Sequence, residues 1–571
     1  MAEHSWDELK KYPEIVKGQW PTIPEMYELT LKKYPTHTCF SVLEKKEKLT
    51  INYQDEYNEI MKVAALLEKA GLKKGDHVLI NGKNSREWAT AYLGILFAGC
   101  VVCPIDNQMN IQRVAELGDF ADCKFVFGDL DIFEKLNNLD SNWYKNINGI
   151  CLLQGKSDNY KNKVYELDIK PLEKKVDVSE YDTAAILFTS GTTGNEKGAL
   201  LSHRNLTSDV YQAADGMGVT DTDTLYALLP LHHSYCCTAV LLETIKHGAE
   251  CLFGHGIVVS RMLNDLKNGN VTVFMGIPLL YNKILSGIEK NLEKKGKATV
   301  KLINALMDYN LWCKVHLGKA PMNKFFNKKI LSQLGLDKTK VLICGAGPLA
   351  PEVFRKYQAL GLNFLQGYGL TETSPILNLN PPEHFKVESV GKVFPFIDMI
   401  IADPNEDGIG EIRVKGDNVC SGYYKDPEHT AELFDENGYL KTGDLGYLDD
   451  ENYLYLKGRS KNLIVTEGGK NVYPEELEDL FQLYGEIDQI LIRGFQEKSD
   501  VPSESIEAVI HPSDDFVKAH PNKEERKELI ENIVKEINKG LAQYKKIEKV
   551  TIVDEPMEMT TTKKIKRALV K

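Results

Sequence analysis

The sequence has neither a paired-cysteine pattern nor a surplus of basic residues. Its eleven cysteines are an odd number, scattered from Cys39 to Cys420. The first residues, MAEHSWDELKKYPE, contain no hydrophobic stretch of the kind found in a signal peptide. A net charge of −12 argues against nucleic acid as a main partner, because phosphate backbones are bound by clustered Lys and Arg. These absences predict a cytoplasmic protein with small-molecule partners.

Long hydrophobic runs are also missing. The longest uncharged stretch, residues 88–105, reaches the lower limit of a membrane-spanning helix, but Gly99 and Pro104 interrupt it. We interpret it as a helix followed by a buried strand that contains Cys100 and Cys103, since no second cysteine pair completes a zinc site. No transmembrane segment is predicted. Peripheral membrane contact stays open, although no basic amphipathic helix stands out.

The order of segments along the chain predicts the fold class. At 571 residues the chain is longer than one hydrophobic core usually supports. Helix-like and strand-like segments alternate from residue 53 to residue 364, and beyond Gly391 the strands become short and are separated by Gly and Asp turns. We predict an α/β fold with a large N-terminal body of mainly parallel sheets flanked by helices over residues 1–460. A small mobile α+β C-terminal lid domain would follow over residues 461–571.

One glycine- and hydroxyl-rich segment, TSGTTGNEKG, follows the apolar run of residues 184–188. Its glycines let the backbone approach an anion closely, and its hydroxyls and lysine add donors. It is not a Walker loop, because Lys197 is followed by Gly198. Taken alone, the segment also fits an ordinary surface turn. We predict a triphosphate-binding loop made by Thr189, Ser190, Gly191, Thr192, Thr193, Gly194 and Lys197.

A second turn-rich segment, residues 366–374, follows another predicted strand. Its residues suit a nucleotide, since Tyr368 can stack on a purine, Thr371 can meet a phosphate and Glu372 can bind magnesium. The alternative is a glycine-rich connection with a tyrosine packed in the core.

Three further positions suggest chemistry. Asp444 on a tight turn and Arg459 after a predicted hairpin suit the two hydroxyls of a ribose, or alternatively form a surface ion pair. Lys564 lies in a cationic C-terminal segment and suits a phosphate site, although such tails are often frayed. His233 follows an apolar segment without ligand-spaced partners, which favours a pocket or core histidine over a metal ligand. No GxSxG nucleophile elbow was found, which disfavours a hydrolase.

Taken together and in this order, the segments resemble the AMP-forming adenylate-forming superfamily, which includes acyl-CoA synthetases, peptide adenylation domains and luciferases. The segments QGYGLTETSP and VTEGGKNVYPEELE are most similar to those of long-chain fatty acyl-CoA synthetases. The resemblance implies activation of a fatty acid by ATP and Mg²⁺, followed by transfer to CoA. A ligase that loads an acyl carrier protein, a ligase for aryl or other acids, and a non-catalytic binding protein remain alternatives. The acyl chain length and the oligomeric state stay open.

The resemblance also implies roles for particular residues. Magnesium ligands would be Thr189 and Glu372, the acyl entrance would lie near His233, and the adenylation lysine would be Lys564. A Lys stands at 563, where the family commonly has Gly. The lid would rotate at Lys461. The other implied ligand contacts are Gly345, Ala346, Gly347, Gln366, Gly367 and Gly369 around adenine, Thr371 at the α-phosphate, Asp444 and Arg459 at the ribose, and Gly468 and Gly469 beside the CoA thiol.

Overall fold

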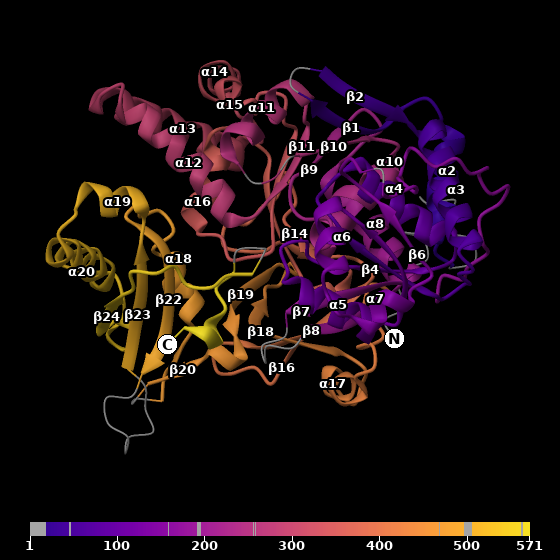
Figure 1. The fold of residues 1–571 in the computed structure, drawn as a ribbon. Helices are drawn as coiled ribbons and strands as arrows, with labels where there is room; N and C mark the ends of the chain where they lie inside the picture. The colour runs from indigo at the N-terminus through magenta and orange to yellow at the C-terminus, as the bar shows by residue number, and fades with distance from the viewer. Residues whose placement is uncertain are drawn as a thin grey trace.

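The computed structural model describes residues 19–44, 47–157, 159–190, 196–254, 256, 258–466, 469–495, 505–560 and 564–570. Within these residues, a large α/β body is followed by a small antiparallel sheet and then by a C-terminal unit, which comprises the elements from β20 onward. Figure 1 shows this unit, in gold, beside the body at the lower left. The predicted α/β fold class is confirmed.

The first sheet of the body has six strands in the order β6-β5-β3-β4-β7-β8. Its pairs are parallel except for the antiparallel pair of β7 and β8, whose strands include Thr189, Ser190 and Lys197 of the predicted phosphate loop. Its strands are β3 (His77–Asn81), β4 (Val101–Pro104), β5 (Cys123–Gly128), β6 (Gly149–Leu152), β7 (Thr183–Ser190) and β8 (Glu196–Ser202).

The second sheet has nine strands in the order β15-β14-β13-β12-β11-β9-β10-β1-β2. Its central strands are parallel, and antiparallel strands complete both edges. They are β1 (Thr38–Glu44), β2 (Glu47–Asn52), β9 (Thr224–Ala227), β10 (Glu250–Phe253), β11 (Val273–Gly276), β12 (Val341–Cys344), β13 (Phe364–Gly369), β14 (Ile376–Leu379) and β15 (Lys392–Val393). Parallel strands direct their carboxyl ends, and the loops that follow them, to one edge of the sheet.

Helices cover the faces of these sheets and several have strong local signals. Ser85 caps α4, whose side chains are almost all buried between layers, and Asn52 caps α3. The long helices are α2 (Ile23–Lys33), α3 (Tyr53–Lys69), α4 (Arg86–Phe97), α5 (Ile111–Phe120), α6 (Leu130–Asn137), α8 (His203–Met217), α11 (Val259–Gly269), α12 (Pro278–Glu293), α13 (Lys297–Leu317) and α16 (Pro351–Ala359). Shorter ones are α7 (Asn142–Asn146), α9 (Ser234–Cys236), α10 (Glu243–His247), α14 (Asn323–Phe326), α15 (Ser332–Leu334) and α17 (Pro427–Leu433). Residues 88–105 form most of α4 and then β4, which confirms the predicted helix followed by a strand.

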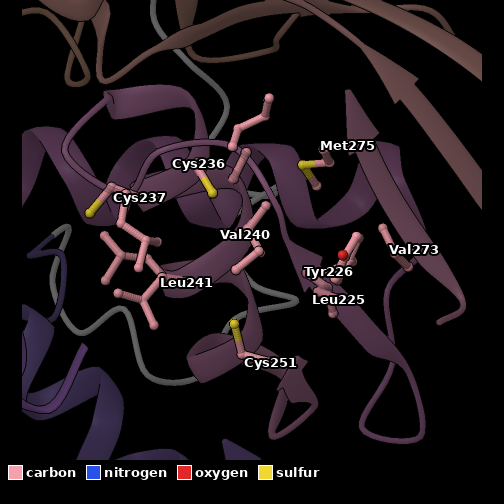
Figure 2. Close-up of a cluster of buried hydrophobic side chains, with 14 of the residues drawn as sticks. Leu225, Tyr226, Cys236, Cys237, Val240, Leu241, Cys251, Val273 and Met275 are labelled. Atoms are coloured by element: carbon pink, nitrogen blue, oxygen red, sulfur yellow. The ribbon is translucent and has the colours of Figure 1, made fainter. Parts of the chain in front are cut away.

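The core of the body includes many of the cysteines. Figure 2 shows Cys236, Cys237 and Cys251 packed among aliphatic side chains such as Val240 and Leu241. All eleven cysteines are buried and free, and burial raises the pKa of the Cys237 thiol to about 12. At these positions cysteine acts as a small apolar side chain.

After the nine-stranded sheet come a four-stranded antiparallel sheet and a C-terminal unit in which β22 and β23 pair antiparallel and β23 and β24 pair parallel. The strands β16 (Ile397–Ala402), β17 (Gly410–Gly416), β18 (Leu440–Leu448) and β19 (Leu454–Arg459) form a four-stranded sheet. The C-terminal unit contains β20 (Ile464–Val465), β21 (Asn471–Val472), α18 (Pro474–Asp479), β22 (Ile487–Phe495), β23 (Ser505–Pro512), α19 (Asp514–Ala519), α20 (Lys523–Lys539) and β24 (Lys549–Ile552). It has its own hydrophobic core, in which Leu477, Ile492 and Ile530 are buried. The predicted boundary between residues 460 and 461 stays a prediction.

Among the described helices, none is both long enough and apolar enough to cross a lipid bilayer.

Candidate active site

A cavity of about 2400 Å³ extends over the body, the antiparallel sheet and the C-terminal unit. It brings together residues from distant parts of the sequence, such as Thr189 and Lys564, which are 375 positions apart. The predicted site residues that line it are Thr189, Lys197, His233, Gly345, Ala346, Gly347, Gln366, Gly367, Tyr368, Gly369, Thr371, Glu372, Asp444, Arg459, Lys461 and Lys564. Gly191, Thr192, Thr193, Gly194 and Gly468 lie outside the described residues, and Ser190 pairs with Glu196 at the end of the β7–β8 hairpin.

The base of the phosphate loop is connected to Glu372 through a tyrosine. Thr189 lies opposite Lys197 in the hairpin, and its hydroxyl donates to the Lys197 carbonyl oxygen over 3.4 Å. The Lys197 ammonium lies 5.2 Å from the centre of the Tyr423 ring, within the range of a cation–π contact. The Tyr423 hydroxyl donates to Glu372 Oε1 over 2.8 Å. Sequence reasoning missed Tyr423, which carries no local motif.

These residues fit a magnesium ion. Mg²⁺ in nucleotide sites usually takes one or two protein oxygens, and substrate phosphates and water complete its octahedron. The bond from Tyr423 occupies one of the two Glu372 carboxylate oxygens, and Thr189 faces the same cavity. Among the described residues, no cluster of three or more His, Cys, Asp or Glu side chains forms an all-protein metal site.

Glycine is required by close backbone approach in the loop that ends β13. A Cβ atom on Gly369 would lie 1.7 Å from the carbonyl oxygen of Pro375, and one on Gly345 would lie 3.0 Å from the Tyr235 ring. Ala346, beside Gly345, has a φ of +64°, an uncommon left-handed conformation for a residue with a side chain. The two loops after β12 and β13 therefore present backbone to the cavity.

Tyr368, Asp444 and Arg459 form one hydrogen-bonded group. The Tyr368 hydroxyl donates to Asp444 Oδ2 over 2.7 Å, and Arg459 Nε donates to Oδ1 of the same carboxylate over 2.8 Å. Asp444 and Arg459 are direct partners in the register of β18 and β19. Burial, reinforced by the Asp444 charge, raises the pKa of Tyr368 well above its usual value. The proximity of Asp444 and Arg459 was predicted, but the bond from Tyr368 was not.

Lys564 comes from the C-terminal unit and lies near groups of the body. Two bonds with Thr560 form its turn: the Thr560 N–H donates to the Lys564 carbonyl oxygen over 2.8 Å, and the Lys564 N–H donates to Thr560 Oγ1 over 3.1 Å. The surrounding protein lowers the pKa of Lys564 by desolvation, and the Arg459 cation lowers it further. Desolvation, together with His232 and Lys564, lowers the pKa of His233 to about 3. His233 is therefore neutral at physiological pH.

An arginine anchors the turn that carries Lys564. The Arg567 guanidinium donates to both carboxylate oxygens of Glu478, each over 2.6 Å, and to the Ile492 carbonyl oxygen over 2.8 Å. Nη2 makes both bonds to Glu478 and Nη1 makes the bond to Ile492, so two nitrogens of the guanidinium are held in place. The alternative of a frayed terminus is therefore wrong for the described residues 564–570.

Thr371 also lies beside the histidine segment. Ser234, which begins α9 directly after His233, has its hydroxyl 3.4 Å from Thr371 Oγ1. The rings of His232 and His233 are 4.3 Å apart, and His232 Nε2 is 3.8 Å from Asp106. His233 thus lies at one wall of the cavity, in agreement with the prediction of a pocket histidine, and His232 packs behind it.

Lys461, expected at the hinge, lines the cavity, whereas Gly469, expected beside the CoA thiol, does not. Lys461 lines the cavity within a short 3-10 turn, Ser460–Asn462. Gly469 does not line it, but lies in the turn between β20 and β21 with a φ of +66°, and its N–H donates to the Thr466 carbonyl oxygen over 2.8 Å. Its role beside a thiol belongs to a rotated lid and stays a prediction.

The cavity brings together the base of the β7–β8 hairpin, the Asp444–Arg459 pair and a lysine from the C-terminal unit. The family model described as "AMP-binding enzyme" matches residues 27–424, and the chain belongs to this family.

Relatives and solved structures agree with that assignment. The long-chain-fatty-acid–CoA ligase ACSBG1 of Rattus norvegicus is 27% identical over 488 residues, covering 81% of this chain and 67% of the relative. The long-chain-fatty-acid–CoA ligase ACSBG2 of Mus musculus is 30% identical over 495 residues, covering 80% and 73%. The O-succinylbenzoate coenzyme A synthetase of Bacillus subtilis, solved with ATP and magnesium ion, shares the fold with a TM-score of 0.72 at 21% identity, covering 95% of this chain and 98% of that one.

Proposed function

We propose that the chain activates a fatty acid with ATP and transfers the acyl group to CoA. In the first step a carboxylate oxygen attacks the α-phosphorus, the bond to pyrophosphate breaks and an acyl-adenylate forms. In the second step the CoA thiol displaces AMP and yields the thioester. The observation that carries the proposal is the position of Lys564, which the C-terminal unit holds in the cavity near Arg459 and His233.

The nucleotide is held by contacts from three parts of the chain. The hairpin from Thr189 to Lys197 would bind the β- and γ-phosphates, and the loop around Tyr368 would flank adenine. Asp444 and Arg459 would bind the ribose hydroxyls. Mg²⁺, held by Thr189 and Glu372 together with phosphate oxygens, supplies charge neutralisation when it is bound.

Lys564 acts on the charge that develops during transfer. In-line attack at phosphorus needs little covalent help from a protein, so positioning and cations provide most of the acceleration. An ammonium group placed beside the α-phosphate and the attacking carboxylate stabilises the transition state more than the ground state. The contact from Arg567 to Glu478 keeps the turn of Lys564 in place for this role.

An apolar wall supports an aliphatic acid as substrate. Part of the cavity is lined by buried side chains with no charge, and a hydrocarbon chain gains free energy by leaving water to contact them. These residues are Met217, Ala239, Met275, Ile343, Cys344, Leu379 and Val390. The relatives named for long-chain fatty acids support the same class.

The second step would use a rotated lid. Hinge motion at Lys461 would withdraw Lys564 and bring the Gly468–Gly469 turn to the thiol path, so that one small unit serves both half-reactions.

A cytoplasmic location is also part of the proposal.

The test is a product assay with a panel of acids. The purified protein is incubated with ATP, Mg²⁺ and short, medium, long or aromatic carboxylic acids, with CoA, with acyl carrier protein, or with neither. We expect acid-dependent AMP and an equal amount of acyl-CoA, with the highest rate for an aliphatic acid. Thioester on the carrier protein alone, or preference for aromatic acids, would select an alternative ligase. Binding of ATP without turnover of any acid would reject the proposal.

A further inference from the structure

Helix α13 exposes an apolar face that the fold leaves uncovered. One stripe of this helix is buried against α16 and α12, and its buried members are Ile303, Met307, Asn310 and Cys313. Figure 1 shows α13 at the edge of the body, with one end projecting away from it. The opposite side faces solvent.

The exposed side carries large hydrophobic residues. Residues spaced three or four positions apart lie on one side of a helix. Positions 302, 305, 309, 312 and 316 have this spacing, and they include Leu302, Tyr309 and Trp312. Three further exposed apolar residues are near this stripe in sequence, two in the last turn of α13 and one in α14 (Asn323–Phe326). We call the six residues together the α13 patch, and their exposed fractions are Leu302 60%, Tyr309 51%, Trp312 52%, Val315 57%, Leu317 57% and Phe325 37%. Single exposed apolar residues are ordinary, but several large ones gathered on one helix and the next indicate a binding surface.

The same segment is strongly basic in an acidic protein. Residues 294–329 contain nine lysines and a single acidic residue, Asp308, whereas the whole chain has a net charge of −12. Eight of these lysines are exposed, namely Lys294, Lys295, Lys297, Lys301, Lys319, Lys324, Lys328 and Lys329. The ninth, Lys314, is directed inward and donates to Gln358 and to the Leu362 carbonyl oxygen.

This composition distinguishes a lipid surface from a protein partner. Protein interfaces are enriched in aromatic residues but depleted in lysine. A bilayer surface favours both, because Trp and Tyr settle at the headgroup level while lysines neutralise anionic headgroups. Long lysine side chains can also extend their ammonium groups to the headgroups from beside an inserted apolar stripe.

We infer that the α13 patch docks the enzyme on the surface of an anionic lipid bilayer. Apolar side chains enter the interface and the eight exposed lysines contact the headgroups. The neighbouring helix α12 packs against α13 and lines the cavity through Asn282, Lys283, Ser286 and Gly287. Docking by α13 therefore places the cavity near the bilayer. Binding itself does not depend on the proposed reaction and is measured separately from it.

The experiment is vesicle binding with the full chain. Vesicles of phosphatidylcholine alone, or with about one third phosphatidylserine, are mixed with the protein and separated by flotation at low and at high salt. We expect binding to the anionic vesicles only. Binding should weaken at high salt, because salt screens the attraction between the lysines and the anionic headgroups. The variants Trp312→Ser and Leu302→Ser should each reduce binding about tenfold or more, since each loses a buried apolar contact. Tyr544→Ser, an exposed aromatic in the C-terminal unit, is the matched control.

Folding and oligomeric state are followed for every variant by thermal unfolding and sedimentation. Trp312→Ser should keep the wild-type unfolding temperature and the wild-type turnover of a short, water-soluble acid. Equal vesicle binding by Trp312→Ser and wild type would overturn the inference, as would absence of binding to anionic vesicles. If wild type forms dimers that Trp312→Ser abolishes while vesicle binding is absent, the patch is instead an interface between two copies of the chain.

Discussion

At the scale of single residues, Asp444 organises the hydrogen bonds of one part of the cavity. One carboxylate oxygen accepts a hydrogen bond from Tyr368, and the other accepts one from Arg459. The two bonds together fix the orientation of the carboxylate. Asp444 also favours the charged form of Lys564, which the Arg459 cation disfavours. A single buried carboxylate thus connects the loop around Tyr368, Arg459 of β19 and the lysine from the C-terminal unit.

Replacement of the lysine should separate the two half-reactions. In Lys564→Ala we expect formation of acyl-adenylate to fall about a hundredfold or more, while thioester formation from preformed acyl-adenylate is spared. The two steps are measured by rapid quench with and without ATP. Lys566→Ala, which loses an ion pair with Glu558, is the control. If Lys563→Ala selectively slows adenylate formation instead, the adenylation lysine is Lys563 and not Lys564. Equal slowing of both steps in Lys564→Ala would contradict a specific role in adenylate formation.

Removal of one hydroxyl tests the group around Asp444. Tyr368→Phe keeps the ring but loses the 2.7 Å bond to the carboxylate. Because a hydrogen bond to a charged group contributes about 1.5–3 kcal/mol, we expect the KM for ATP to rise about tenfold or more. The control is Tyr455→Phe, whose hydroxyl donates to Asp449 over 3.2 Å outside the cavity. Equal KM values for the two variants would show that Tyr368 acts only as a ring.

A buried carboxyl in the body predicts a pH dependence of stability. Glu56 accepts from the hydroxyls of Thr90 and Tyr165 over 2.6 and 2.7 Å, and burial raises its pKa to about 7. As pH rises from about 4.5 to 7, the unfolded chain releases this proton before the folded chain does, so stability falls; outside this window the contribution of Glu56 is constant.

A glutamine at position 56 has the shape of the protonated carboxyl and does not titrate, so it removes the fall in stability that Glu56 causes as pH rises. Relative to wild type, Glu56→Gln should therefore gain about 3 kcal/mol of unfolding free energy between pH 4.5 and pH 8. Urea unfolding at several pH values measures the difference, with the exposed Glu166→Gln as control. Parallel profiles for Glu56→Gln and wild type would contradict the assignment of a raised pKa.

At the scale of elements, one side chain connects the C-terminal unit to the body. Gln482, just beyond α18 (Pro474–Asp479), accepts from the Ala350 N–H over 2.9 Å and from Asn282 Nδ2 over 3.3 Å. Its Nε2 donates to the Pro348 carbonyl oxygen over 3.1 Å. These bonds hold the unit in the orientation that places Lys564 in the cavity.

Loss of this contact should affect one step more than the other. If the lid rotates between steps, Gln482→Ala weakens only the orientation seen here, so adenylate formation should fall about five- to tenfold and thioester formation should not. Single-turnover rates of each step provide the measurement. Gln333→Ala, on the exposed helix turn of α15, is the control. Equal slowing of both steps would show that Gln482 has no preference between orientations.

Local signals in the sequence identified many elements but not their partners. The alternation of helices and strands predicted from residue 53 onward is present, because periodicity and turn residues are local properties. The tight turn predicted for Asp444 is wrong, since Asp444 lies within β18 and pairs directly with Arg459 of β19. Tyr423, Gln482 and Arg567 were missed, since only the tertiary fold places them beside Glu372, Ala350 and Glu478. Likewise α13 has two apolar stripes, and its sequence alone does not tell which one the body covers.

At the scale of the whole molecule, the site exists only where the body, the antiparallel sheet and the C-terminal unit meet. The body supplies the β7–β8 hairpin and the loops after β12 and β13, the antiparallel sheet supplies Asp444 and Arg459, and the C-terminal unit supplies Lys564. The antiparallel sheet shares the hydrophobic core of the body, whereas the C-terminal unit has its own. A cavity between two parts with separate cores can be rearranged by moving one of them. This arrangement suits a reaction in two steps.

The most direct test follows an oxygen atom. A fatty acid labelled with ¹⁸O in its carboxylate is incubated with the enzyme, ATP, Mg²⁺ and CoA, and the products are weighed by mass spectrometry. Attack of the carboxylate on the α-phosphorus, followed by thiol displacement, transfers one labelled oxygen to each AMP and leaves pyrophosphate unlabelled. Label in inorganic phosphate together with ADP, or unlabelled AMP, would contradict the account.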